Sequence, residues 1–224
     1  MKDLFLEVDS IQKSFNGNNI LKNISFQVKK GEIVSIIGRN GSGKSTLFDV
    51  IFGSISSENK FVRINGEVKK NTFEVKDGLA FVTQFNHFPQ NIKVKTLIDL
   101  FIDEERIKIK FLEDDLIMNI LKHRVKNTSY GQQRYLQVKI YLYSTSSFCI
   151  LDEPFAGLSP LMIDNISRQI IEQSNHKGII ISDHQYEYVL NISTKNYVLK
   201  EGNLIKIEDR NDLKKLGYLN NYPK

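Results

Sequence analysis

The chain has 224 residues, which is enough for one large domain or for a domain with a subdomain. Apolar residues make up 41% of it, and the net charge of +5 comes from basic residues mixed with acids, which favours a solvated surface over a nucleic-acid patch. No apolar run approaches the ~20 residues that span a bilayer, and acids interrupt the first residues, so we expect neither a transmembrane segment nor a signal peptide. We therefore expect a soluble, intracellular protein that binds no nucleic acid. Its single cysteine, Cys149, lies in an apolar run, which predicts a buried side chain and excludes an internal disulfide.

The first part of the chain has the pattern of β-strands. Leu4, Leu6 and Val8 alternate with polar residues, and a second alternating run follows at residues 24–28. A turn-rich stretch at residues 15–19 separates the two runs, so we expect an N-terminal antiparallel β subdomain. The next run, residues 33–37, is almost entirely branched and aliphatic, which is typical of a parallel strand covered on both faces.

A phosphate-binding motif follows that strand directly. Residues 38–46 fit the pattern G-x-x-x-x-G-K-[ST], and a helix-like run continues to Phe52. Glycines let several backbone N–H groups point at one anion, and the start of the helix adds its own unpaired N–H groups. The pattern predicts that Lys44 reaches the terminal phosphates and that Ser45 ligates Mg²⁺. The residues expected to bind the phosphate chain are Gly38, Arg39, Asn40, Gly41, Ser42, Gly43, Lys44, Ser45 and Thr46.

The middle of the chain changes from strands to helices. Short strands are predicted at residues 61–64 and 79–83, with Asn65-Gly66 as a turn signal after the first. Apolar residues then recur at helical spacings, at Leu112, Leu116 and Ile120 among other positions. We expect a helical subdomain at about residues 86–143, inserted in a core that makes residues 1–224 a single domain.

The last third alternates strands and helices again. We expect a buried strand at residues 148–151, a helix from Pro160 to about Ser174, and another buried strand at residues 178–182. Two alternating strand candidates, residues 197–200 and 204–207, precede a short polar helix. The strand–helix–strand order from residue 33 onward predicts an α/β fold with a mainly parallel sheet.

Two carboxylates end the strand at residues 148–151. Ligands of open α/β sheets lie at the carboxyl ends of strands, so Asp152 is placed to hold Mg²⁺ through its carboxylate oxygens. Glu153 is placed to orient or deprotonate an attacking water. An acidic loop at a strand end is the alternative interpretation, and the neighbouring phosphate motif disfavours it.

At this point the sequence resembles the nucleotide-binding subunit of an ATP-binding cassette (ABC) transporter, a P-loop NTPase. The likeness runs from Phe15 to about Gly202, with the motifs in the family's order. Gln84 resembles the Q-loop, residues 128–134 (Thr-Ser-Tyr-Gly-Gln-Gln-Arg) resemble the signature LSGGQ-x-R, residues 156–160 resemble the D-loop, and His184 resembles the switch histidine.

The resemblance implies a role for each matched residue. Phe15 would stack on adenine, Gln84 would touch Mg²⁺ or the water, and His184 would contact the γ-phosphate. Glu153 would be the catalytic base, with Lys44, Gln84 and His184 as the other catalytic residues. The resemblance implies a head-to-tail dimer with a second ABC subunit, identical or a paralogue, in which each ATP lies between the phosphate loop of one chain and the signature of the other. ATP-driven closing of that dimer would power transport. The helical segment would meet a membrane-spanning subunit at the inner face of the cell membrane. The signature residues expected to contact that ATP are Ser129, Gly131 and Gln132.

Some readings stay open at this point. Ser129 is also a good helix N-cap, and Phe15 could be a core or turn aromatic. Tyr130 replaces the family's first signature glycine, and Ser159 replaces a common aspartate of the D-loop. Both positions belong to motifs that the family uses in contacts across the dimer. A soluble cassette ATPase of the iron–sulfur assembly type is the alternative to a transporter subunit.

Overall fold

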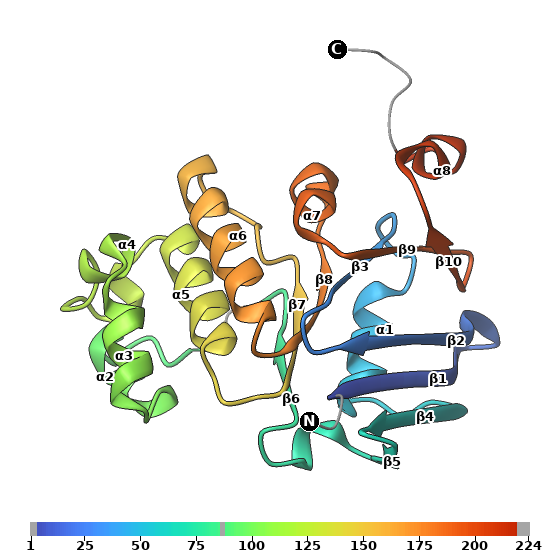
Figure 1. The fold of residues 1–224 in the computed structure, drawn as a ribbon, viewed down its shortest axis with the longest axis horizontal. Helices are drawn as coiled ribbons and strands as arrows, with labels where there is room; N and C mark the ends of the chain where they lie inside the picture. Colours follow the sequence, from blue (N-terminus) through green and yellow to red (C-terminus); the bar gives the residue numbers. More distant parts are fainter. Residues whose placement is uncertain (1–3, 86–87, 219–224) are drawn as a thin grey trace.

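The computed structural model describes residues 4–85 and 88–218, which form two β-sheets with helices packed between and beside them (Figure 1). The smaller sheet is antiparallel, with strand order β2-β1-β4-β5. Its strands are β1 (Phe5–Phe15), β2 (Asn18–Lys29), β4 (Asn59–Ile64) and β5 (Glu67–Val68). Asn65 and Gly66, both with positive φ, form the turn between β4 and β5. The expected N-terminal antiparallel sheet is confirmed.

The larger sheet has six strands in the order β10-β9-β3-β8-β7-β6. These strands are β3 (Ile33–Ile37), β6 (Leu79–Val82), β7 (Phe148–Asp152), β8 (Gly178–Ser182), β9 (Lys195–Lys200) and β10 (Asn203–Ile207). All neighbours pair in parallel except β9 and β10, which are joined by a tight turn. The mainly parallel sheet predicted from the strand–helix alternation is therefore confirmed.

Both faces of the larger sheet are covered, which explains why its central strands are mostly apolar on both faces. Alternate residues of one strand enter different cores: Ile179 and Ile181 join the core with α5 and α6, whereas Ile180 joins the core with α1. The same alternation places Cys149 in the first core and Ile150 in the second. Cys149 is fully buried, as expected, and burial raises the pKa of its thiol to about 12.

Helix α1 (Lys44–Phe52) has the predicted bounds and lies between the two sheets. Its apolar residues Leu47, Phe48 and Ile51 are buried in the core shared with β1 and β2. The helix ends at Gly53, whose φ of 97° is left-handed and therefore suits glycine. This packing fixes the start of α1, and with it the phosphate motif, between two rigid sheets.

Among the described residues between β6 and β7 there are four α-helices: α2 (Val94–Phe101), α3 (Glu105–Leu112), α4 (Asp115–Met118) and α5 (Tyr130–Leu142). In Figure 1 the first three are the green helices at the left edge. The apolar spacing of Leu112, Leu116 and Ile120 does not mark one helix, because Asp114 caps α4 and its carboxylate accepts the Leu116 N–H at 3.0 Å. Two short 3-10 helices are η1 (Thr72–Glu74) and η2 (Val125–Asn127).

The last helices are α6 (Pro160–Ser174), α7 (Tyr186–Ile192) and α8 (Arg210–Lys215). Helix α6 has the predicted bounds, with Pro160 in its first turn. Helix α7 has no counterpart among the predicted elements, and it is held by packing against α6 and β3. Across the described residues, every helix is too short or too polar to cross a membrane.

Candidate functional site

Four neighbouring strands of the parallel sheet bring their polar residues to one edge. The strands β3, β8, β7 and β6 are adjacent in this order, and their carboxyl ends point the same way. The phosphate motif follows β3, and His184 follows β8. Asp152 ends β7 and Glu153 comes directly after it, whereas Gln84 follows β6. This topology brings together residues from four distant parts of the sequence.

The phosphate loop has the backbone that its glycines predict. Gly41 and Gly43 have φ of 76° and 101°, and a Cβ on Gly43 would lie 2.8 Å from the Ile20 side chain. Lys44 begins α1, and its buried ammonium donates to the carbonyl oxygens of Gly38 at 2.8 Å and Arg39 at 3.2 Å. The lysine thus lies folded against its own loop.

A cleft of about 600 Å³ opens in front of this loop. Predicted residues from the loop and from the strand ends line it together. They are Phe15, Asn40, Gly41, Gly43, Lys44, Ser45, Thr46, Gln84, Glu153 and His184, joined by Ile20. Gly38 and Ser42 support the loop without lining the cleft, and the hydroxyl oxygen of Ser42 is buried without a partner among the described residues.

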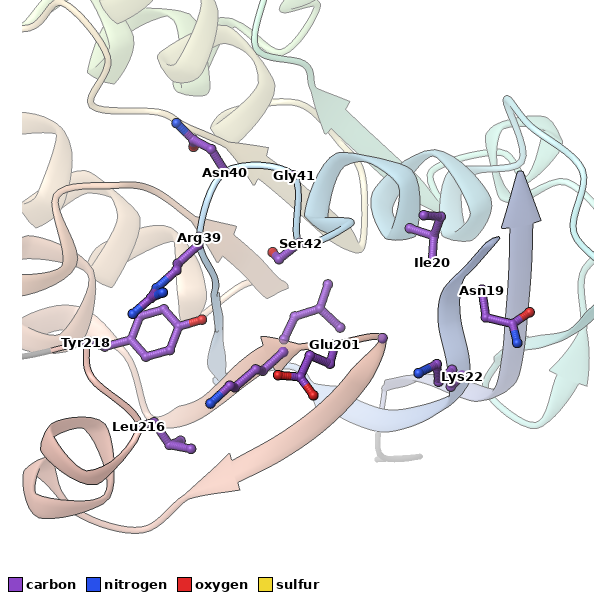
Figure 2. A pocket seen from close by; sticks show the side chains of 13 residues that line it. Asn19, Ile20, Lys22, Arg39, Asn40, Gly41, Ser42, Glu201, Leu216 and Tyr218 are labelled. Carbon is purple, nitrogen blue, oxygen red and sulfur yellow. The ribbon is translucent and has the colours of Figure 1, made fainter. Parts of the chain in front are cut away.

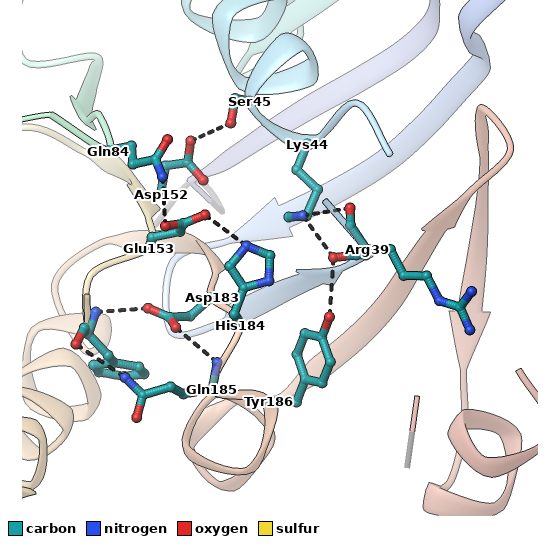
Figure 3. Close-up of polar contacts among 12 residues, drawn as sticks. Arg39, Lys44, Ser45, Gln84, Asp152, Glu153, Asp183, His184, Gln185 and Tyr186 are labelled. Atoms are coloured by element: carbon teal, nitrogen blue, oxygen red, sulfur yellow. Dashed lines mark hydrogen bonds and ion pairs between the residues drawn. The ribbon is translucent and has the colours of Figure 1, made fainter. Parts of the chain in front are cut away.

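Glu153 lies at the centre of the polar contacts in the cleft. Its two carboxylate oxygens are held separately: Oε2 accepts from Gln84 Nε2 and Oε1 lies against His184 Nε2, each at 2.9 Å (Figure 3). Its backbone has a φ of 53°, a left-handed conformation that is unusual for glutamate and marks a constrained turn. The carboxylate is therefore oriented by an amide and an imidazole from two other strand ends.

Asp152 lies deeper than Glu153 and has the environment of a cation ligand. Its Oδ2 accepts from the Ser45 hydroxyl at 2.8 Å, whereas its buried Oδ1 has no partner among the described residues. Burial raises the pKa of this carboxyl to about 6, because the buried carboxylate is poorly solvated. In the described chain, no cluster of three or more His, Cys, Asp or Glu forms a complete metal cage. One carboxylate with a hydroxyl fits Mg²⁺, which usually takes its remaining ligands from phosphates and water.

Two supporting residues lie outside the predicted set. Arg134, which is 1% exposed, donates to the carbonyl oxygens of Thr83 (2.6 Å), Glu153 (2.9 Å) and Asp152, and so ties the ends of β6 and β7 together. Asp183 accepts from the backbone N–H of Phe155 at 2.8 Å, and burial raises its pKa. Arg134 is the last residue of the segment that resembles the signature, so its place in the motif could be read from the sequence, whereas its contacts could not.

Arg39 does not join the other loop residues in the cleft. Its guanidinium lies 5.9 Å from the centre of the Tyr218 ring, and Figure 2 shows it beside that ring in a neighbouring cavity of about 520 Å³. The Tyr218 ring also contacts Tyr186, whose hydroxyl donates to the Gly38 carbonyl at 3.3 Å. The Arg39 side chain therefore points away from the cleft, and the phosphate contact expected of this loop residue stays a prediction.

The signature residues lie outside the cleft. Ser129 caps α5, because its hydroxyl oxygen accepts the Gln132 N–H at 3.2 Å while the Gln132 side chain accepts the Ser129 N–H at 2.9 Å. Tyr130 is 58% exposed, and its ring covers Gly157, where an added Cβ would lie 2.5 Å from the ring. Gly131 is packed against the Gly157 carbonyl, so the signature and the D-loop touch within one chain.

The fold and the cleft define a P-loop nucleotide-binding domain of mixed α/β architecture. A family model described as "ABC transporter" matches residues 21–156. This chain therefore belongs to the ABC transporter family and has the fold of its ATP-binding subunits.

Individual relatives are consistent with this assignment. The chain is 30% identical to the ribose import ATP-binding protein RbsA of Shouchella clausii, over 90% of this chain and 44% of that protein. It is 25% identical to the lipopolysaccharide export system ATP-binding protein LptB of Haemophilus influenzae, over 89% of this chain and 88% of that protein. A solved "ATP binding subunit of ABC transporter" superimposes with a TM-score of 0.83 at 23% identity, over 96% of this chain and 94% of that one. The chain thus spans less than half the length of the ribose import protein.

Proposed function

We propose that this chain binds ATP with Mg²⁺ in the cleft and hydrolyses it as the ATPase subunit of a membrane transporter. The observation that carries the proposal is the pair of 2.9 Å contacts that hold Glu153 between Gln84 and His184, beside the phosphate loop. Phosphoryl transfer depends on positioning and charge stabilisation more than on covalent chemistry, and this arrangement supplies both.

Each group around the cleft has a task in this proposal. The exposed ring of Phe15 stacks on the adenine, a contact worth about 1–3 kcal/mol. The loop N–H groups and Lys44 bind the phosphate chain, with the lysine exchanging the Gly38 carbonyl for phosphate oxygens. Ser45, Asp152 and Gln84 would hold Mg²⁺, which supplies positive charge to the terminal phosphates.

Glu153 acts as the general base. Its carboxylate takes a proton from the attacking water, while the Gln84 amide keeps the carboxylate in orientation. The imidazole of His184 releases Glu153 and donates to the γ-phosphate, which adds charge stabilisation as the bond to the leaving group breaks.

A second ABC subunit completes the site. The backbone N–H groups of Tyr130 and Gly131 open α5 and lie outside this chain's own cleft, so they suit an ATP bound to another subunit. The partner that receives the mechanical work is a membrane-spanning subunit. The exposed side chains of Phe85, Leu100 and Phe101 support a docking surface for it on the segment between β6 and α2 and on α2. Through that partner the chain lies at the inner face of the cell membrane.

The base assignment is tested with Glu153→Gln, measured by steady-state phosphate release. We expect the rate to fall at least about 100-fold while ATP binding persists, because a general base contributes roughly 10²–10⁴-fold. Glu208→Gln is the matched control, since Glu208 is a glutamate of the exposed surface that pairs with Lys206. A rate for Glu153→Gln within about twofold of the wild type would contradict the assignment.

The two partners are tested separately. Light scattering of the Glu153→Gln chain with ATP should show a dimer, and an added Ser129→Arg substitution should abolish it. For the membrane subunit, Phe85→Cys provides an accessible thiol, because Cys149 is fully buried. We expect the thiol at position 85 to cross-link to a co-expressed membrane subunit. If this chain and the membrane subunit co-purify but do not cross-link, the docking surface lies elsewhere on the chain.

A further inference from the structure

A further cavity, with basic side chains in its wall, lies at the edge of the sheet opposite the nucleotide cleft. It measures about 410 Å³ and opens at the amino ends of β7 and β8, against the exposed side of α3. Its walls come from three segments that are distant in sequence: α3, the connection from α5 to β7, and the connection from α6 to β8. The polar side chains that matter here are Arg106, Lys110, Ser144, Ser146, His176 and Lys177.

The charge of this cavity is one-sided. Arg106, Lys110 and Lys177 are cations, His176 is an imidazole, and no carboxylate of the described residues lines the cavity. Glu172 forms an ion pair with Lys110 from outside the lining and offsets one of the three charges. Two cations are therefore left without a carboxylate partner in the cavity wall.

Lys177 is the unusual member of this group, because it is 2% exposed. Its ammonium donates to the Ser144 carbonyl at 2.8 Å and to the Ser146 hydroxyl at 3.4 Å, both neutral acceptors. Within the described chain, no carboxylate lies within 4.0 Å of this ammonium. A buried charge is costly unless it is paired, and burial lowers the pKa of Lys177 accordingly. An anion in the cavity would supply the missing counter-charge.

We propose that this cavity binds a phosphate-type oxyanion, between Lys177 on the inside and Arg106 and Lys110 at its mouth. The Arg106 guanidinium and the Lys177 ammonium match the acceptor oxygens of a phosphate, and Lys110 adds an ammonium that already pairs with Glu172. The Ser144 and Ser146 hydroxyls contact each other at 2.9 Å, and Ser144 donates to the Tyr141 carbonyl, so they form the wall of the site. The same chemistry is presented by a free phosphate ester and by a phospholipid headgroup. The inference does not depend on the ATPase function, since the two sites share no residue.

His176 provides a local probe of occupancy. Its imidazole resonance is assigned with His176→Gln and followed by NMR in the full chain during titration with sodium phosphate, against sodium chloride at equal ionic strength. His184 lines the nucleotide cleft and reports phosphate bound there separately. We expect a saturable shift at His176. Flotation with phosphatidylglycerol vesicles, compared with phosphatidylcholine vesicles, tests the headgroup as the source.

Matched variants identify the site. Arg106→Ala should weaken the interaction detected by either probe about tenfold, because it removes a charge-assisted contact. Lys108→Ala is the control, since Lys108 lies on the same helix, pairs with Asp99 at 2.9 Å and does not line the cavity. Lys177→Met should abolish binding, and the exposed Arg106 keeps the test valid if that buried variant fails to fold. Two results together would overturn the proposal. Sodium chloride would shift the His176 resonance as much as sodium phosphate does, and Arg106→Ala would bind the vesicles as well as the wild type does.

Discussion

Replacing Arg134 by methionine tests the packing beneath the cleft. The guanidinium donates to the carbonyl of Asp152 and to Gln137 Oε1 (2.7 Å) in fully buried contacts, and to the carbonyls of Thr83 and Glu153 in partly buried ones. Methionine has a similar length but no donor. All four acceptors would lose the guanidinium. The Glu153 carbonyl would keep the Ala156 N–H at 3.1 Å, whereas the two buried acceptors cannot turn to water.

The magnitude follows from these two buried acceptors. An unsatisfied buried acceptor costs about 1–3 kcal/mol, which gives about 2–6 kcal/mol for two. Removing a buried cation from a low-dielectric site returns part of this cost. We therefore expect Arg134→Met to lower the free energy of unfolding by about 3 kcal/mol. Arg134→Lys should fall between the wild type and methionine, since one ammonium reaches fewer carbonyls than a planar guanidinium.

Urea denaturation followed by circular dichroism measures this change, with equal m-values showing that the unfolded states are comparable. Arg168→Met is the control. Arg168 is a helix-surface arginine that donates to the Asp164 carbonyl at 3.3 Å and to Asn165 at 2.9 Å. Its substitution should change stability by less than about 0.5 kcal/mol. A loss below about 1 kcal/mol for Arg134→Met would refute the reasoning, because water would then be satisfying the freed carbonyls.

Three further predictions concern stability. The pKa of Asp152 is raised to about 6 in the folded chain, so ionisation of this carboxyl opposes folding. Its contribution to the free energy of unfolding should therefore become less favourable as pH rises from about 4 to about 6. Above pH 6, Asp152→Asn should be more stable than the wild type by at most about 3 kcal/mol, measured by denaturation across pH. Gly157→Ala should lower the melting temperature more than Gly17→Ala, because both glycines have positive φ but only at Gly157 would the methyl meet a ring, at 2.5 Å. Lys139→Met should lower the free energy of unfolding by about 3–5 kcal/mol in urea denaturation. In the wild type the Lys139 ammonium lies 2.7 Å from the Asp114 carboxylate, and the substitution leaves that partly buried carboxylate without its cation. A change near zero would mean that solvent reaches the pair.

Much of the fold was predictable because its signals are local. The bounds of β3, α1, α6 and β8 agree with those expected from apolar runs, the loop glycines and Pro160. Each of these signals acts within a few residues: a run of branched side chains suits a strand buried on both faces, and a glycine permits positive φ. Helix α7 escaped prediction because tertiary packing, and no strong local pattern, holds it.

The candidate site divides in the same way. The phosphate loop and the order of Gln84, Glu153 and His184 could be predicted from the sequence, because each is tied to the end of a strand. The positions of their partners could not be predicted, because they depend on how the elements pack. Arg134 reaches Thr83, 51 residues earlier, and Arg39 turns toward Tyr218 and away from the cleft. A hydrogen bond or a ring contact depends on the distance between two elements in the folded chain. The assembly of the sheet sets that distance, and the local sequence pattern does not contain it.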